Sequence, residues 1–192
     1  MSRYASFLCS IIVFLSGCGN EKKKVTHAPP EEYATLKVMT YNVLFSTSDD
    51  QTLEVLKETG ADIIGLQEAS PARIAHLAQK LRYYHHSFSK TTANMSNEDT
   101  GILSRFPITR FFQNGVVIKI NPALEVAVFT VHLLPYPYEP YDFRDGIITT
   151  PEEAVASASL NRLPGFEPVI DEIASALSEG YPVFLTGDFN EP

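Results

Sequence analysis

The sequence has few cysteines, an excess of acidic over basic side chains, and no apolar run long enough to cross a membrane. Its 192 residues include only two cysteines, Cys9 and Cys18, so a fold held by several disulfides is excluded. There are 15 Lys and Arg residues against 23 Asp and Glu residues, and the formal net charge is -8. Because non-specific nucleic-acid binding rests on Lys and Arg, this balance argues against broad affinity for nucleic acid. It does not exclude an enzyme that holds phosphate through a divalent cation.

An apolar run from Phe7 to Leu15 follows Arg3 near the N-terminus. The run is too short to span a bilayer stably and is typical of the apolar region of an export signal. It ends in Leu15-Ser16-Gly17-Cys18, which resembles the lipobox of bacterial lipoproteins. That resemblance implies a signal peptide over residues 1–17, with cleavage before Cys18 and lipid attachment to it. An ordinary signal peptide, or a buried strand with a chance cysteine, is the alternative.

The remainder divides into a short tether and one domain. Residues 18–34 contain lysine, proline and glutamate with little apolar content, which predicts a tether. Residues 35–192 have an ordinary apolar fraction and enough length to bury a core. The lipidated cysteine would be the only one left after cleavage, so no intrachain disulfide is expected.

Apolar segments separated by turn residues predict strands and helices in alternation, the order typical of an α/β domain. Strands are predicted over residues 36–44, 62–68, 101–105, 116–120, 125–133 and 181–190. Helices are predicted from Asp49 or Asp50 to Gly60, from Ser70-Pro71 through Leu81, and from a Thr150 capping box to Gly180 with an interruption at Pro164-Gly165. Residues 116–133 predict a hairpin and hence a mixed sheet, and residues 134–149 a proline-punctuated loop.

Polar side chains stand where four of these strands end. They are Asn42, Glu68, His132, and the pair Asp188 and Asn190. Carboxylates and amides at the carboxyl edge of a sheet can hold a metal-bound phosphate. The structural alternatives are an Asx-type turn at Asp188, a solvated or helix-capping Glu68, and a hydrogen-bonded core histidine at 132. The adjacent pair His85-His86 diverges on a strand and is interpreted as structural, as is Arg105.

Five segments around these positions resemble, in order, the motifs of the endonuclease/exonuclease/phosphatase superfamily, to which DNase I belongs. They are Thr40-Tyr41-Asn42-Val43-Leu44, Leu66-Gln67-Glu68, Ile102-Leu103-Ser104-Arg105-Phe106-Pro107-Ile108, Thr130-Val131-His132-Leu133 and Gly187-Asp188-Phe189-Asn190. The resemblance covers Leu36 to Pro192. It implies a four-layer α/β sandwich, in which two mixed sheets pack face to face and helices cover the outside.

The resemblance also implies roles for the individual residues. Glu68 is expected to bind Mg²⁺, with Mn²⁺ as an alternative, and Asn42 to join the metal shell or orient the phosphate. Four residues are expected to act in catalysis, namely His132, Asp188, Asn190 and Glu98. Glu98 is expected to be the acid that pairs with His132.

The predicted loop carries Tyr136, Tyr138, Tyr141 and Phe143. These rings either pack within the protein or form a substrate rim, in which Arg144 is the expected polar contact. The family also closes its site with a Ser-Asp-His segment, whose histidine activates water. No such segment occurs in this sequence, so we expect a domain incomplete at its C-terminus and negligible activity of the chain as written.

The sequence therefore predicts a magnesium-dependent phosphoester hydrolase of phosphodiesterase, nuclease or phosphatase type. It is expected at the bacterial cell envelope, held in the inner or outer membrane through Cys18. Three substrate classes are considered, namely nucleic acid, phospholipid and small phosphoesters. Nucleic acid is expected only as a substrate and not as a binding partner. The alternative is a non-catalytic surface lipoprotein, or an inactive fragment, that keeps the same fold.

Overall fold

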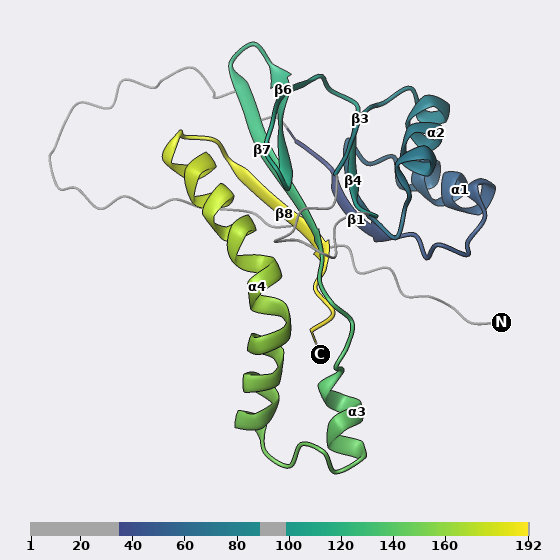
Figure 1. Ribbon diagram of the computed structural model, residues 1–192. Helices are drawn as coiled ribbons and strands as arrows, with labels where there is room; N and C mark the ends of the chain where they lie inside the picture. The colour runs from purple at the N-terminus through teal and green to yellow at the C-terminus, as the bar shows by residue number, and fades with distance from the viewer. Residues whose placement is uncertain (1–34, 89–98, 192) are drawn as a thin grey trace, which may run out of the picture. The chain divides into compact units, whose positions relative to one another are not determined.

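The computed structural model of the protein describes residues 35–88 and 99–191 (Figure 1). The predicted signal peptide, the tether and Cys18 lie outside these ranges. The strands are β1 (Val38–Asn42), β2 (Ile63–Gln67), β3 (Tyr84–Ser87), β4 (Gly101–Ser104), β5 (Ile108–Phe111), β6 (Gly115–Asn121), β7 (Leu124–His132) and β8 (Val183–Asp188). The helices are α1 (Asp49–Thr59), α2 (Pro71–Leu81), α3 (Glu139–Arg144) and α4 (Pro151–Ser178). Within the described ranges, no helix is both long enough and apolar enough to cross a membrane.

The strands form two mixed sheets of four strands each. The first sheet has the order β1-β2-β4-β3, and the second has the order β5-β6-β7-β8. One pair in each sheet is parallel, β1 with β2 and β7 with β8, and the other pairs are antiparallel. The antiparallel pairing of β6 with β7 confirms the predicted hairpin.

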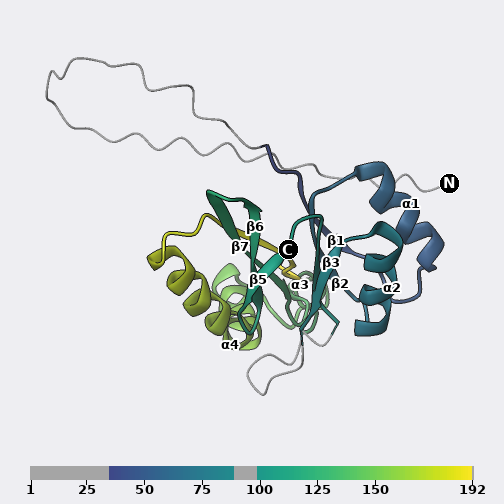
Figure 2. The same cartoon turned by 90° about the horizontal axis from the view of Figure 1, so that it is seen from above.

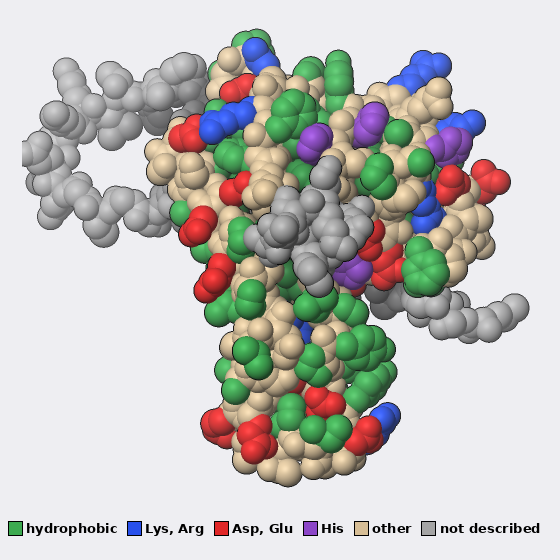
Figure 3. All heavy atoms as spheres, in the orientation of Figure 1, with side chains coloured by type: hydrophobic (Ala, Val, Ile, Leu, Met, Phe, Trp, Pro, Cys, Tyr) green, Lys and Arg blue, Asp and Glu red, His purple; other side chains and the backbone are tan. Residues whose placement is uncertain are grey.

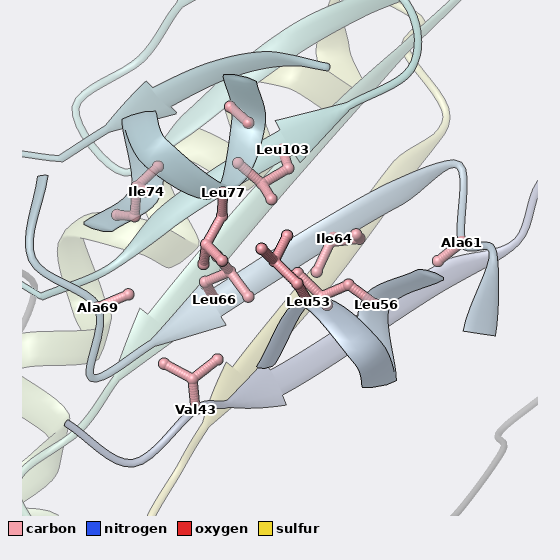
Figure 4. Packing of buried hydrophobic residues seen from close by; sticks show 11 residues of the cluster. Val43, Leu53, Leu56, Ala61, Ile64, Leu66, Ala69, Ile74, Leu77 and Leu103 are labelled. Carbon is pink, nitrogen blue, oxygen red and sulfur yellow. The ribbon is translucent and has the colours of Figure 1, made fainter. Parts of the chain in front are cut away.

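Three apolar layers hold the sheets and helices together. Figure 2 shows the two sheets between α1 and α2 on one side and α4 on the other. On the outer face of the first sheet, Leu53 and Leu56 of α1 and Leu77 of α2 pack against β2 (Figure 4). A second cluster, which includes Ile63 and Val128, lies between the sheets. A third cluster joins α4 to the outer face of the second sheet. The order helices, sheet, sheet, helix is the predicted four-layer sandwich.

The helix ends follow local sequence rules, with one correction. We predicted that Asp49 or Asp50 would cap α1, but the cap is Ser48, whose side chain accepts the backbone N–H of Gln51. Both aspartates lie in the first turn instead, where a negative charge interacts favourably with the helix dipole. Gly60 ends α1 with a left-handed φ of 59°, as expected for glycine after a helix. Ser70 and Pro71 begin α2 as predicted.

Helix α4 is continuous, so the predicted interruption at Pro164-Gly165 is wrong. Pro164 and Pro168 both lie inside the helix, although an interior proline costs about 3 kcal/mol through its missing N–H and its ring. Packing against the second sheet offsets this cost, because Val169 on the inner face of α4 is fully buried. The Thr150 capping box at its start is present as predicted.

The segment predicted as a loop, residues 134–149, contains the short helix α3. In Figure 1, α3 and the first half of α4 lie beyond the ends of the strands. Many apolar side chains are exposed on this part of the surface (Figure 3). They include Tyr141, Phe143, Ile147, Val155 and Leu160.

Candidate functional site

The carboxyl ends of strands from both sheets meet at one point of the fold. The end of β1 and the end of β8 contact each other across the two sheets, where Thr40 Oγ1 accepts the backbone N–H of Gly187 at 3.0 Å. The register between β7 and β8 places His132 opposite Asp188. This junction brings together Asn42, Glu68, His132 and Asp188, which the sequence placed at separate strand ends.

Asn42 joins the two carboxylates of the site. Its side-chain Nδ2 donates to Glu68 Oε1 at 2.8 Å and to Asp188 Oδ2 at 2.9 Å. Its Oδ1 accepts the backbone N–H of Leu44 at 2.9 Å. In this arrangement the amide orients both acids, and its oxygen is already used within the loop that follows β1. The predicted roles of Asn42 in the metal shell or on the phosphate stay predictions.

Glu68 leaves β2 in an unusual backbone conformation. Its φ is 58°, in the left-handed region where residues other than glycine carry a strain of about 1–2 kcal/mol. Its second carboxylate oxygen accepts the backbone N–H of Phe45 at 3.2 Å. A strained backbone that is held by hydrogen bonds at both side-chain oxygens is typical of a functional position.

His132 pairs with Asp99 at the end of β7. The two oxygens of Asp99 lie 3.1 and 3.2 Å from Nδ1 of His132, which donates to them. Burial lowers the pKa of His132, but the hydrogen bond and charge of Asp99, with the charges of Asp188 and Glu68, outweigh it and raise the pKa above 6.5. The imidazole is therefore biased toward the charged form, which can donate to a phosphate oxygen.

Sequence reasoning assigned the partner of His132 to Glu98, which lies outside the described residues. The pairing that the structure shows is with the next residue, Asp99. No sequence pattern in this segment pointed to Asp99. In the structure, Ala69 N donates to Asp99 O and holds this segment beside Glu68.

Asp188 and Asn190 form a tight turn after β8. The backbone N–H of Asn190 donates to Asp188 Oδ1 at 3.1 Å, and φ of Asn190 is 49°. Nδ2 of Asn190 donates to the carbonyl of Leu133 at 2.8 Å. The Asx-type turn is therefore present, and it leaves Asp188 Oδ2 facing Asn42. The functional roles of Asp188 and Asn190 stay predictions.

A cavity of about 430 Å³ opens at this junction. It is lined by Thr40, Asn42, Gln67, Tyr138, Gly187, Asp188, Phe189, Asn190 and Glu191. These lining residues include two aromatic rings and two acids but neither Lys nor Arg. The lining residues offer hydrogen-bond donors to a phosphate, whereas Glu68 and His132 lie outside the lining.

A polar network crosses the space between the sheets below the cavity, and the sequence reasoning missed it. Gln67 is 1% exposed, and its Nε2 donates to Thr130 Oγ1 at 2.9 Å. Thr186 donates to the carbonyl of Phe129 at 2.9 Å. Polar residues in otherwise apolar strands are the signal that was available. The network satisfies buried polar groups and fixes the spacing of the sheets under the site.

The donor set fits one hard divalent cation. Among the residues that the structure describes, no three His, Cys, Asp or Glu side chains form a metal cluster by themselves. Mg²⁺ uses few protein ligands, often one or two carboxylates, and completes its octahedron with water and phosphate. Glu68 and Asp188 both accept from the same amide nitrogen, so their carboxylates face the same point of the site, where a cation could interact with either acid.

The remaining predicted residues fall around the site or away from it. Tyr138 lines the cavity, which favours the rim interpretation for that ring. Arg144 does not line the cavity, and its guanidinium pairs with Asp145. Its contact with substrate stays a prediction. Arg105 braces Tyr83 and Asp62, as its structural interpretation implies.

Solved structures show the same arrangement of sheets and helices. Truncated TDP2 from Caenorhabditis elegans is 18% identical with a TM-score of 0.50, over 82% of this chain and 63% of that one. A functionally unknown conserved protein from Enterococcus faecalis V583 is 16% identical with a TM-score of 0.54, over 81% and 67%. ANGEL2, a 2′,3′-cyclic phosphatase in complex with adenosine-2′,3′-vanadate, is 20% identical with a TM-score of 0.52, over 81% and 53%.

The chain thus spans less than two thirds of the length of the TDP2 and ANGEL2 structures. No curated protein sequence matches it. Residues 39–192, from β1 to the end of the chain, match the model of the endonuclease/exonuclease/phosphatase family. The chain therefore belongs to the endonuclease/exonuclease/phosphatase family.

Proposed function

We propose that the protein is a divalent-metal-dependent phosphoester hydrolase that uses Mg²⁺, with Mn²⁺ as an alternative. The observation that carries the proposal is the amide of Asn42, which holds Glu68 and Asp188 together beside a cavity that Asn42 and Asp188 line. Two carboxylates held this way serve no purpose in packing, because each would be more favourable in water. They are suited to hold a cation and the phosphate bound to it.

The side chains divide the work of phosphoryl chemistry. Glu68 would hold the cation, and Asp188 would orient an attacking water. Charged His132 would donate to a phosphate oxygen as negative charge develops there, in a site already shaped for it. When bound, the metal supplies further charge neutralisation at the phosphorus oxygens. The predicted phosphate contact by Asn190 would use the second N–H of its side-chain amide, because the first donates to the carbonyl of Leu133.

The related structures support this class of reaction. ANGEL2 is a 2′,3′-cyclic phosphatase, and it was solved with a vanadate ester of adenosine. The substrate proposed here is a phosphoester of the same general chemistry, drawn from nucleic acid, phospholipid or small phosphoesters. A cavity without Lys or Arg in its lining favours a singly charged phosphodiester over a polyphosphate.

Cation binding is the direct test, because it does not require turnover. Titration of the purified chain with Mn²⁺, followed by electron paramagnetic resonance, should reveal one site. Glu68→Gln should weaken it at least tenfold. Glu58→Gln, a matched change on the exposed face of α1, should leave it unchanged. Equal binding by all three proteins would contradict the proposal.

Turnover is tested with bis(p-nitrophenyl) phosphate in the presence of Mg²⁺. Any hydrolysis by the chain should disappear with EDTA and in Glu68→Gln. Hydrolysis that persists in EDTA would contradict a metal-dependent mechanism.

We also propose that the protein is exported and held at the cell envelope by a lipid on Cys18. The lipobox-like segment Leu15-Ser16-Gly17-Cys18 supports this proposal. Expressed in a bacterium, the wild-type protein should sediment with membranes, and Cys18→Ser should release it to the soluble fraction. Membrane association that is unchanged in Cys18→Ser would argue against the anchor.

A further inference from the structure

Arg162 is a fully charged side chain buried in the middle of α4. The residue is 3% exposed, and its nearest acid, Glu139 of α3, is 2% exposed. A buried guanidinium is costly unless each of its donors finds a partner. Its partners therefore show what the residue is placed to do.

One side of the guanidinium binds Glu139. Nη1 donates to Glu139 Oε1 at 3.0 Å, and Nη2 donates to Oε2 at 2.6 Å. Ser157 of α4 also donates to Oε1 at 2.9 Å. The hydrogen bond from Arg162 is the main reason that the pKa of Glu139 lies below its usual value. This part of the contact joins α3 to α4 and needs only a charged pair.

The other side of the guanidinium binds two backbone carbonyls at the cavity. Nε donates to the carbonyl of Asn190 at 3.1 Å, and Nη2 donates to the carbonyl of Pro137 at 3.0 Å. Asn190 lines the cavity, and so does Tyr138, which follows Pro137. Arg162 thus ties together two walls of the cavity from behind.

The bond to Asn190 acts on a strained residue. Asn190 has a φ of 49°, and a left-handed conformation persists only where its surroundings hold it. Its N–H donates to Asp188 Oδ1, and Asp188 Oδ2 in turn accepts from Asn42. A continuous path of hydrogen bonds therefore runs from Arg162 through the turn at Asn190 to the carboxylate of Asp188.

We propose that Arg162 is a positioning residue for the phosphoester site, which sets the turn at Asn190 and thereby the orientation of the Asp188 carboxylate. The site in question is the one of the proposed function, so the inference rests on that function. Lysine at this position could keep the positive charge beside Glu139. It lacks the planar guanidinium group, whose several N–H donors contact the acid and both carbonyls at once.

The test compares three variants of the full chain, Arg162→Lys, Glu139→Gln and Arg110→Lys. Glu139→Gln removes the charge pair with Glu139 and leaves the bonds to both carbonyls and the weaker pair with Glu191, whose Oε1 lies 3.5 Å from Arg162 Nε. Arg110→Lys is a control for an arginine that ties β5 to the far end of α4 through Glu179. The first readout is amide hydrogen exchange, by nuclear magnetic resonance, in the metal-free proteins.

Two amides report on the position of Asp188. They are Leu133 N, which donates to Asp188 O at 2.9 Å, and Asn190 N, which donates to its side chain. In Arg162→Lys both should exchange at least tenfold faster, while Val128 in the middle of β7 stays within twofold. Glu139→Gln and Arg110→Lys should leave the two reporters within threefold of the wild-type rates. The proposal would be overturned if the Val128 amide also exchanged at least tenfold faster in Arg162→Lys. It would also be overturned if Arg162→Lys and Glu139→Gln accelerated the two reporter amides equally, because either result would mean that Arg162 acts only in stability.

The second readout is kinetic. If the wild-type protein turns over, Arg162→Lys should lower kcat at least tenfold. The Mg²⁺ concentration that gives half-maximal activity should stay within threefold, because Glu68 is unchanged. An unchanged kcat would contradict the positioning role. If the wild-type chain neither binds Mn²⁺ nor turns over, the proposed function fails, and the exchange rates alone then decide whether Arg162 positions the turn.

Discussion

Among the described residues, Asp99 does most to keep His132 charged. Burial acts against the charged imidazole, and the bond to Asp99 heads the contributions that raise its pKa above 6.5. Removal of that carboxylate takes this contribution away, while burial continues to lower the pKa. The pKa of His132 in Asp99→Asn should therefore fall below its wild-type value, as measured by nuclear magnetic resonance titration without metal.

The same pair has a consequence for stability. Because the folded pKa lies above the unfolded value, the pair stabilises the protein fully below about pH 6.5. This contribution is lost as the pH rises through the folded pKa. The loss of unfolding free energy in Asp99→Asn should accordingly be larger at pH 5.5 than at pH 8.5. A loss that grows with pH would show that the pair acts in another way.

Gly65 of β2 has no side chain, and this absence leaves room for side chains of the facing sheet. A Cβ at this position of β2 would lie 2.0 Å from Thr186 Oγ1 and 3.0 Å from Thr130 Oγ1, both on the facing sheet. Gly65→Ala should cost about 1–3 kcal/mol of unfolding free energy, the usual cost of overpacking a core. Chemical denaturation of the single and double variants tests this. The loss should shrink in a Thr186→Ala background, and strict additivity would contradict the clash.

The sequence predicted most of the site but not all of its residues. Asn42, Glu68, His132 and Asp188 were predicted because each ends a recognisable strand, and the structure brings them together. Glu98, the predicted partner of His132, lies outside the described residues. Asp99, which pairs with His132 in the structure, was not predicted, because a one-residue difference in a loop changes no periodic pattern. The contact depends on how residues 99–101 approach β7, which is a property of the tertiary structure.

Helix α4 allows a matched comparison of two valines. Val169 faces the second sheet and is fully buried, whereas Val155 near the start of the helix is 66% exposed. Val169→Ala should cost about 2 kcal/mol through lost apolar burial and the resulting cavity. Val155→Ala should change the unfolding free energy by less than about 0.5 kcal/mol. Denaturant titration of both variants measures the difference, and equal losses would mean that α4 does not pack as described.

The predictions at the scale of elements failed where packing overrode local preference. The interruption at Pro164-Gly165 was inferred from residues that disfavour helix, but the buried positions Arg162 and Val169 on either side anchor the helix. The helix α3 was missed because its six residues contain a proline and two aromatic rings. Its stability comes from the buried pair of Glu139 with Arg162, which joins residues 23 positions apart. No local pattern reveals such a pair.

At the scale of the whole domain, the two sheets share one apolar layer. The cluster between them takes buried residues from both, such as Ile63 of β2 and Val128 of β7. Neither sheet can expose this face alone without a large cost in apolar hydration. Residues 35–192 should therefore unfold in one cooperative transition, with coincident curves by circular dichroism and tyrosine fluorescence. Two separate transitions would show that the sheets are independent.

The junction of β1 with β8 also determines how the site comes into being. Asn42 and Asp188 are 146 positions apart in the chain, and contacts between such distant segments form slowly because a long loop must close first. A folding intermediate that contains only the first sheet would hold Asn42 and Glu68 but lack Asp188. No short segment of the chain contains the whole site. Its formation during refolding therefore reports when the N-terminal and C-terminal halves of the domain come into contact.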